Sequence, residues 1–116
     1  MHRIFTTSVA SVYALYVAKV ERKGHSGDGV DEVIRWLTGF DQEALERHLA
    51  DGTVFVDFFE AAELNPNATL ITGSICGVRV QDVADPLMQQ IRYLDKLVDE
   101  IARGRPMSRI LRGSAS

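Results

Sequence analysis

The stretch that decides the fold runs from Asp85 to Arg103 and reads DPLMQQIRYLDKLVDEIAR. Asp-Pro is a strong helix start, because the aspartate can cap the first free N–H groups and the fixed φ of proline suits the first helical position. Gly104 then marks the end of the helix. Its apolar residues recur at alternating spacings of four and three, and they are Leu87, Ile91, Leu94, Val98 and Ile101. This spacing predicts a long amphipathic helix that forms one wall of a helical core.

The same apolar seam has the average period of a coiled coil, but it is short. It spans two heptads, whereas about three to four are needed to indicate a coiled coil. We therefore expect the seam to face the core of its own domain. A homodimer seam is the alternative.

Outside this stretch, caps and glycines divide the chain into further short elements. Thr7 or Ser8 is expected to cap the first helix, Asp41 the third and Thr53 the fourth. Apolar residues at helical spacing follow each of these starts. The expected helices cover residues 8–23, 30–38, 41–52, 54–64 and 107–111.

Residues 69–77 can be interpreted in two ways. Their Thr, Ile and Val favour a strand, whereas the Asn65-Pro66 start signal and the length of the segment favour a helix. We favour the helix, followed by an extended segment at 78–80. Together the elements predict an all-α fold, a single-domain orthogonal bundle of about six helices over residues 1–112, with a minor extended segment near 78–80 and a disordered tail at 113–116.

Composition fits one ordinary globular domain. The 116 residues are 46% hydrophobic and 25% charged, so the chain can bury a core without disulfides. One cysteine indicates a reducing compartment, and no stretch approaches the roughly twenty apolar residues of a membrane span. The uncharged run at 4–18 is diluted by Thr, Ser and Tyr and has helical-face spacing, which argues against a signal peptide. We predict a cytoplasmic protein without membrane association.

The net charge of −3 hides a segregated distribution. Residues 41–102 carry twelve acidic and four basic side chains, a net charge of −8, whereas residues 103–116 carry four arginines and no acid. The acidic body makes duplex nucleic acid an unlikely partner, because it repels phosphate. Arg105, Arg109 and Arg112 form a candidate patch for an anion or an acidic partner. The alternative is that these arginines are solvated or pair with the acidic body of the same molecule.

Motifs that carry catalytic chemistry are missing from the sequence. It has no phosphate-binding loop, no paired metal-ligand motif and no nucleophile elbow. Cys76 stands among small residues, which favours a packing role over a nucleophile. We therefore predict no catalytic residue, no metal site and no cofactor.

One group of side chains could line a ligand site near the first two helices. Tyr13, Tyr16, Lys19 and Arg22 follow one another at intervals of three, and Trp36 is the lone indole. Aromatic rings and cations together suit an anionic or aromatic ligand. The alternative is that the tyrosines pack with their hydroxyls at the rim while the indole anchors the core.

Several ordered blocks of the chain resemble a known family. They are residues 11–13 (SVY), 16–17 (YV), 19–24 (KVERKG), 33–39 (VIRWLTG), 70–73 (LITG), 75–80 (ICGVRV), 85–88 (DPLM) and 91–100 (IRYLDKLVDE). Over nearly its whole length the chain resembles the bacterial domain of unknown function 2200 (DUF2200). The resemblance implies a stand-alone bacterial domain with no assigned activity, substrate or catalytic residue. This chain departs from the family pattern at residues 27–29 (GDG), which should delay the start of the second helix.

These observations favour a non-catalytic cytoplasmic binding or interaction module, with a homodimer or a protein partner as its associate. The first alternative is a small-ligand-binding protein or enzyme with a site near the first two helices. The second is a nucleic-acid-associated regulator that acts through the C-terminal arginines.

Overall fold

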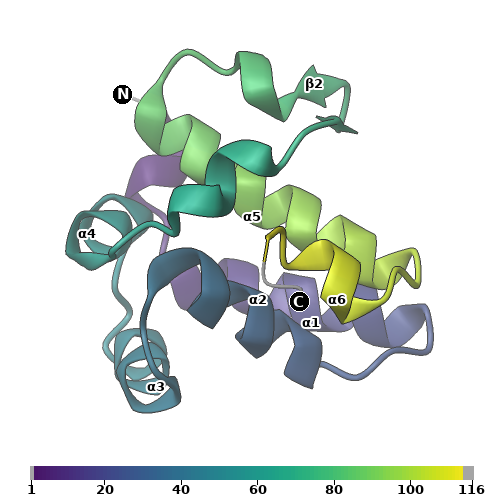
Figure 1. Cartoon of the computed structure of the whole chain (residues 1–116). Helices are drawn as coiled ribbons and strands as arrows, with labels where there is room; N and C mark the ends of the chain where they lie inside the picture. Colours follow the sequence, from purple (N-terminus) through teal and green to yellow (C-terminus); the bar gives the residue numbers. More distant parts are fainter. Residues whose placement is uncertain (1, 114–116) are drawn as a thin grey trace.

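Helix α5 (Pro86–Ala102) is the central element of the computed structural model, which describes residues 2–113 (Figure 1). It contacts α1, α2, α4, α6, β1 and η3. The other elements are η1 (Arg3–Thr6), α1 (Val9–Arg22), α2 (Asp28–Thr38), α3 (Gln42–Ala50), α4 (Phe55–Ala61), η2 (Pro66–Leu70), β1 (Ser74–Ile75), β2 (Val78–Arg79), η3 (Val80–Asp82) and α6 (Met107–Ile110). The predicted all-α fold with a minor extended segment is confirmed, and the described residues form six α-helices.

Side-chain caps start three of the helices where the sequence predicts them. The carboxylate of Asp85 accepts a hydrogen bond from the Met88 N–H at 2.9 Å, and Ser8 and Asp41 cap α1 and α3 in the same way. Thr53 does not cap α4, which begins after Val54 without a side-chain cap. The Thr53 hydroxyl instead meets Nδ1 of the His48 ring at 3.0 Å, so it ties the α3–α4 turn.

Helix α2 begins earlier than predicted. Asp28 is its first residue, although glycines stand on both sides of it. Gly29 lies against the side chains of Ile101 and Met107, where a Cβ would meet methyl carbons at 3.3–3.4 Å. Because that close approach and the acidic first turn favour the helix here, the GDG segment does not delay its start.

The predicted helix at 69–77 is wrong. The segment after η2 forms a hairpin in which Ser74 pairs with Arg79 and Ile75 with Val78. The two turn residues, Cys76 and Gly77, both have positive φ, at 52° and 79°. A two-residue hairpin turn requires this conformation, which a helix cannot contain. Cys76 is exposed in this turn, so its predicted packing role is also wrong.

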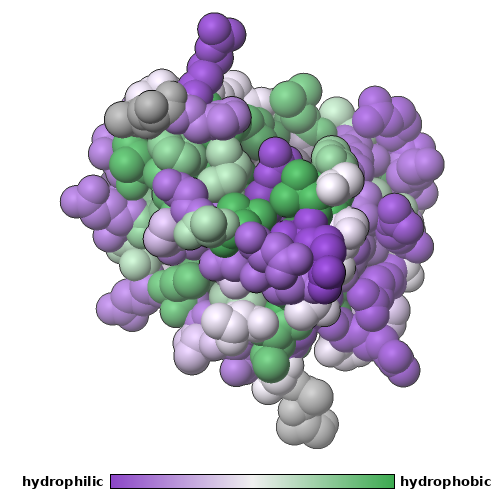
Figure 2. All heavy atoms as spheres, turned by 90° about the horizontal axis from the view of Figure 1, so that it is seen from above, coloured by the Kyte–Doolittle hydropathy of each residue, from purple (hydrophilic) through white to green (hydrophobic). Residues whose placement is uncertain are grey.

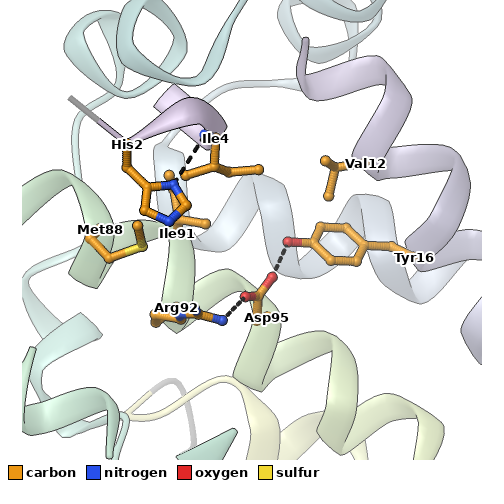
Figure 3. Close-up of a pocket in the computed structure, with 8 residues that line it drawn as sticks. All are labelled: His2, Ile4, Val12, Tyr16, Met88, Ile91, Arg92 and Asp95. Carbon is orange, nitrogen blue, oxygen red and sulfur yellow. Dashed lines mark hydrogen bonds and ion pairs between the residues drawn. The ribbon is translucent and has the colours of Figure 1, made fainter. Parts of the chain in front are cut away.

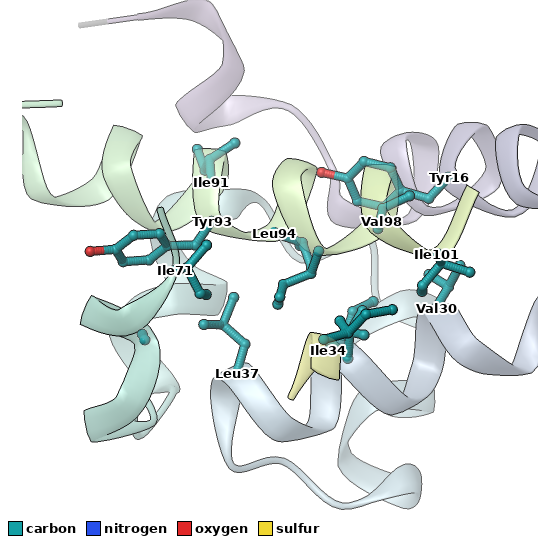
Figure 4. Packing of buried hydrophobic residues seen from close by; sticks show 14 of the residues in the cluster. Tyr16, Val30, Ile34, Leu37, Ile71, Ile91, Tyr93, Leu94, Val98 and Ile101 are labelled. Carbon is teal, nitrogen blue, oxygen red and sulfur yellow. The ribbon is translucent and has the colours of Figure 1, made fainter. Parts of the chain in front are cut away.

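The core lies between α5 and the helices that surround it (Figure 4). Ile34 and Leu37 of α2 face Leu94 of α5, and all three are fully buried. Four of the five seam residues predicted in α5 are buried, and Leu87 is half-buried. Because the seam packs inside the molecule, it is not available to a coiled-coil partner, and a homodimer through another face stays a prediction.

The undescribed ends of the chain limit one further prediction. Residues 1 and 114–116 lie outside the described part, so the predicted disordered tail at 113–116 lies outside it except for Gly113.

Within residues 2–113, no helix is long and apolar enough to cross a membrane. On the face seen in Figure 2, apolar side chains form separate patches divided by hydrophilic ones.

Candidate ligand pocket

A pocket of about 160 Å³ lies between η1, α1 and α5 (Figure 3). Its wall combines apolar side chains from all three elements with a few polar groups. The lining residues are His2, Ile4, Val12, Tyr16, Met88, Ile91, Arg92 and Asp95. A cavity of about 150 Å³ in an apolar core can hold benzene, whereas drug-sized ligands occupy roughly 300–1,000 Å³. The pocket therefore suits a ligand of only a few heavy atoms.

A short polar chain crosses one side of the pocket. The Tyr16 hydroxyl donates to Oδ1 of Asp95 at 2.5 Å, and Nη1 of Arg92 donates to Oδ2 at 3.3 Å. The α1–α5 contact brings Tyr16 to Asp95, and the i,i+3 spacing on α5 brings Arg92 to the same carboxylate. Both carboxylate oxygens of Asp95 are thus engaged, whereas only one nitrogen of Arg92 has a partner among the described residues.

Burial changes the acid–base behaviour of the pair. Burial and the nearby Asp95 charge raise the pKa of Tyr16 well above 10.0, so its hydroxyl keeps its proton at neutral pH. Burial also raises the pKa of Asp95, although the Tyr16 hydrogen bond and the Arg92 charge oppose that rise. The Tyr16–Asp95 pair is a hydrogen-bonded contact between α1 and α5, and the protonated Tyr16 hydroxyl is a poor nucleophile.

His2 contributes a further polar edge at the mouth of the pocket. Its Nδ1 accepts a hydrogen bond from the Ile4 N–H at 3.2 Å, which fixes the ring over η1. In Figure 3 the ring lies beside Met88 and Ile91. The other ring nitrogen is left for solvent or a ligand, since no described residue bonds it.

Only one of the five residues predicted for the ligand site lines this pocket. That residue is Tyr16. The Tyr13 hydroxyl donates to Asp31 at 2.6 Å, and Lys19 forms an ion pair with Asp99 at 3.2 Å. Burial and the Asp31 hydrogen bond raise the pKa of Tyr13 to about 12.

The two remaining predicted residues lie elsewhere. Arg22 is exposed in the last turn of α1. Trp36 is half-buried on α2, and its carbonyl accepts from the Asn65 side chain at 3.2 Å. The structure thus spreads the predicted group over several contacts and does not bring it together in one cleft.

The predicted arginine patch is divided in a similar way. Arg112 donates to both carboxylate oxygens of Glu100, at 2.5 and 2.7 Å, and Arg105 adds a bond at 3.0 Å. Glu100 is only 1% exposed, so this contact lies inside the molecule. Arg109 is exposed and has no ion pair within residues 2–113. Two of the three arginines therefore pair with the acidic body.

Sequence reasoning missed His2, Arg92 and Asp95 as pocket residues. The i,i+3 spacing of Arg92 and Asp95 on an expected helix was a usable signal for their pairing. No local pattern indicates that Asp95 meets Tyr16, which lies 79 residues away in the sequence. Across the described chain, no group of three His, Cys, Asp or Glu side chains lies together as metal ligands would.

Comparisons with known proteins give a family and a fold but no activity. Residues 3–112 match the family described as "Uncharacterized protein conserved in bacteria (DUF2200)". A solved structure, titled "Crystal structure of uncharacterized protein SP1917", is similar to 96% of this chain and 93% of its own, with 42% sequence identity and a TM-score of 0.89. No curated protein matches the chain.

Proposed function

The chain belongs to the DUF2200 family of uncharacterised bacterial proteins, and we propose that it is a non-catalytic cytoplasmic binding protein that takes a small ligand in the pocket between η1, α1 and α5. The proposal rests on a difference between Arg92 and Asp95 in how many of their hydrogen-bonding atoms have partners. Asp95 has a partner on each oxygen, whereas Arg92 reaches the pocket with donors to spare.

A small organic anion fits this arrangement best. Guanidinium binds carboxylates through parallel N–H donors, and Arg92 spends only Nη1 on Asp95. Ile4, Val12 and Ile91 offer an apolar wall for a short hydrocarbon part. The ligand class is therefore a short-chain monocarboxylate, with its carboxylate on Arg92 and its carbons against the wall.

Binding is favoured over catalysis because the Tyr16 and Asp95 side chains of the pocket hold each other. The raised pKa of Tyr16 removes it as a base near neutral pH. Cys76, which could be a nucleophile, lies in the β1–β2 turn and does not line the pocket. The single cysteine of the sequence supports the cytoplasmic location.

The test is an NMR titration of the purified protein with butanoate, using n-butylamine and 1-butanol as matched probes of equal length. We expect saturable shifts of Ile4, Val12 and Ile91 with butanoate and weaker or no binding of the other two. Arg92→Gln should weaken butanoate binding by about tenfold or more, because a charge-assisted hydrogen bond contributes roughly 1.5–3 kcal/mol.

Arg103→Gln is the matched control. Arg103 also pairs with an aspartate of α5, Asp99, at 2.8 Å, but it is 73% exposed and lines no part of the pocket. It should leave butanoate binding unchanged. Equal binding of n-butylamine, unchanged binding to Arg92→Gln, or no saturable shift would each reject the proposal.

A further inference from the structure

A second hollow lies on the surface between α4 and the first turns of α5. It is a shallow groove of about 260 Å³. The lining residues are Val56, Phe59, Glu60, Pro86, Leu87 and Gln90. The ligand pocket uses other residues of α5, so the two hollows share no lining residue. Four of its six lining residues are apolar and form its floor, and the other two are Glu60 and Gln90.

Unpaired acids border this floor. Glu60 lines the groove, and Asp57 is exposed one turn before it on α4. Within residues 2–113 neither carboxylate forms an ion pair, although Asp95, Asp99 and Glu100 of α5 all do. Asp85, directly before Pro86, adds a third exposed negative charge beside the groove. The acids of α4 are thus available to a partner, whereas those of α5 are already used.

We infer that this groove docks a cationic amphipathic segment of another protein. Apolar side chains of the segment pack on Val56, Phe59 and Leu87, and its Lys or Arg residues pair with Glu60 and Asp57. This is the helix-in-groove mode of recognition, in which apolar anchors contribute affinity and charges set orientation. Neither the pocket ligand nor its binding is needed for this contact.

Charge argues against the other occupants. A second copy bound symmetrically through the same groove would bring the acidic borders of the two copies together, and like charges across an interface are costly. Nucleic acid and anionic membranes are repelled by the same carboxylates. A basic segment is the occupant that the groove and its border both favour.

The test uses two synthetic peptides that share their leucines. The first has the sequence LKKLLKLLKKLLKL, and the second carries glutamate at every lysine position. NMR titration of the whole protein should give saturable shifts centred on Val56, Phe59 and Leu87 with the lysine peptide only. Glu60→Lys should weaken that binding by about tenfold and should improve binding of the glutamate peptide.

Glu43→Lys is the matched control, because Glu43 is an exposed acid on α3 that has no ion pair within residues 2–113 and lies outside the groove. It changes the net charge by the same amount and should change lysine-peptide binding less than twofold, by an effect of overall charge alone. The inference is overturned if both variants lose the same affinity, if the shifts spread over the whole acidic surface, or if the glutamate peptide binds the unchanged protein equally well. Because the groove variants leave the pocket intact, butanoate binding can fail or succeed independently of this result.

Discussion

Two carboxylates of α5, Asp95 and Glu100, both pair with arginine but have different roles. Around the middle of the helix, Asp95 is shared between Tyr16 and Arg92, and a pocket stays open beside it. Near the end, Glu100 is 1% exposed and receives Arg105 and Arg112 from the segment that follows the helix. Both sites pair a carboxylate with arginine, but Arg92 lines an open pocket, whereas Glu100 receives donors from two arginines and is buried.

The difference shows which charges build the fold and which can bind. At the C-terminal end, the bidentate Arg112–Glu100 contact fastens α6 over α5, together with the fully buried Ile110. At the pocket end, the Arg92–Asp95 pair is about a quarter exposed on each side and forms within one helix. Substitutions at the two ends should therefore have unequal effects on stability.

The largest effect is expected from Glu100→Gln. Removing the charge leaves Arg112, which is 15% exposed, without its counter-ion, and breaking a buried pair in this way costs about 3–5 kcal/mol. Urea denaturation at neutral pH measures the loss. Glu43→Gln, at an exposed site on α3, should change the free energy of unfolding by less than about 0.5 kcal/mol. A loss at Glu100 no larger than this control would show that the contact does not hold α6.

A smaller loss is expected from Tyr16→Phe. The ring remains, but Asp95 loses the donor at 2.5 Å, and hydrogen bonds to charged groups contribute roughly 1.5–3 kcal/mol. The matched control is Tyr93→Phe, because the Tyr93 ring is also buried while its hydroxyl bonds no described residue. Thermal denaturation should show a larger fall in melting temperature for Tyr16→Phe than for Tyr93→Phe. Equal falls would mean that burial of the Tyr16 ring, and not the hydrogen bond of its hydroxyl, stabilises the contact of α1 with α5.

Helix α5 could be predicted from the sequence because the signals that define it are local. Asp85 and Pro86 act within one turn, and the apolar spacing of the helix needs no knowledge of its neighbours. The hairpin was missed for the opposite reason. Cys76 is an unusual residue for a turn position with positive φ, where Asn, Asp or Gly is expected, so the turn had only Gly77 as a signal.

The pocket could be predicted only in part. Tyr16 was identified from its place among aromatic and cationic residues on α1, but that pattern also included Tyr13 and Lys19, which pair with other acids. Choosing between them requires knowing which turn of α1 faces which turn of α5. That register depends on tertiary packing, and the spacing of residues along one helix does not contain it.

A still smaller effect on stability is expected from Arg92→Gln. The Arg92–Asp95 pair forms within one helix and is about a quarter exposed on each side, and i,i+3 ion pairs on a helix contribute about 0.2–0.5 kcal/mol. Arg112→Gln at the other end of α5 should cost several times more, because its partner is buried. Denaturation curves of the two variants test the comparison directly. Similar losses would contradict the view that only the C-terminal pair supports the fold.

The smallest effects are expected in the pH dependence, where Asp95 and Asp99 should differ in sign. Burial raises the pKa of Asp95 above its ordinary value of 3.8. Burial also acts on Asp99, but the hydrogen bond and charge of Lys19, with the charge of Arg103, outweigh it and lower the pKa of Asp99 below 3.8. Carbon-detected NMR titration of the two carboxyl groups should therefore find the Asp95 midpoint above the Asp99 midpoint.

These shifts have opposite consequences for folding. The folded state holds the Asp95 proton more tightly than the unfolded chain does, so the contribution of Asp95 to stability falls as pH rises from 3.8 through its folded pKa. The contribution of Asp99 is present above 3.8 and is lost as pH falls from there through its lowered folded pKa. Asp99→Asn should thus reduce stability at neutral pH and have much less effect below that lowered pKa. Asp95→Asn should instead remove, at neutral pH, the unfavourable free energy of burying the Asp95 charge. The amide oxygen of the Asp95→Asn variant can still accept the Tyr16 hydrogen bond. A large loss of unfolding free energy in this variant at neutral pH would therefore mean that attraction to the Arg92 charge outweighs the cost of burying the Asp95 charge.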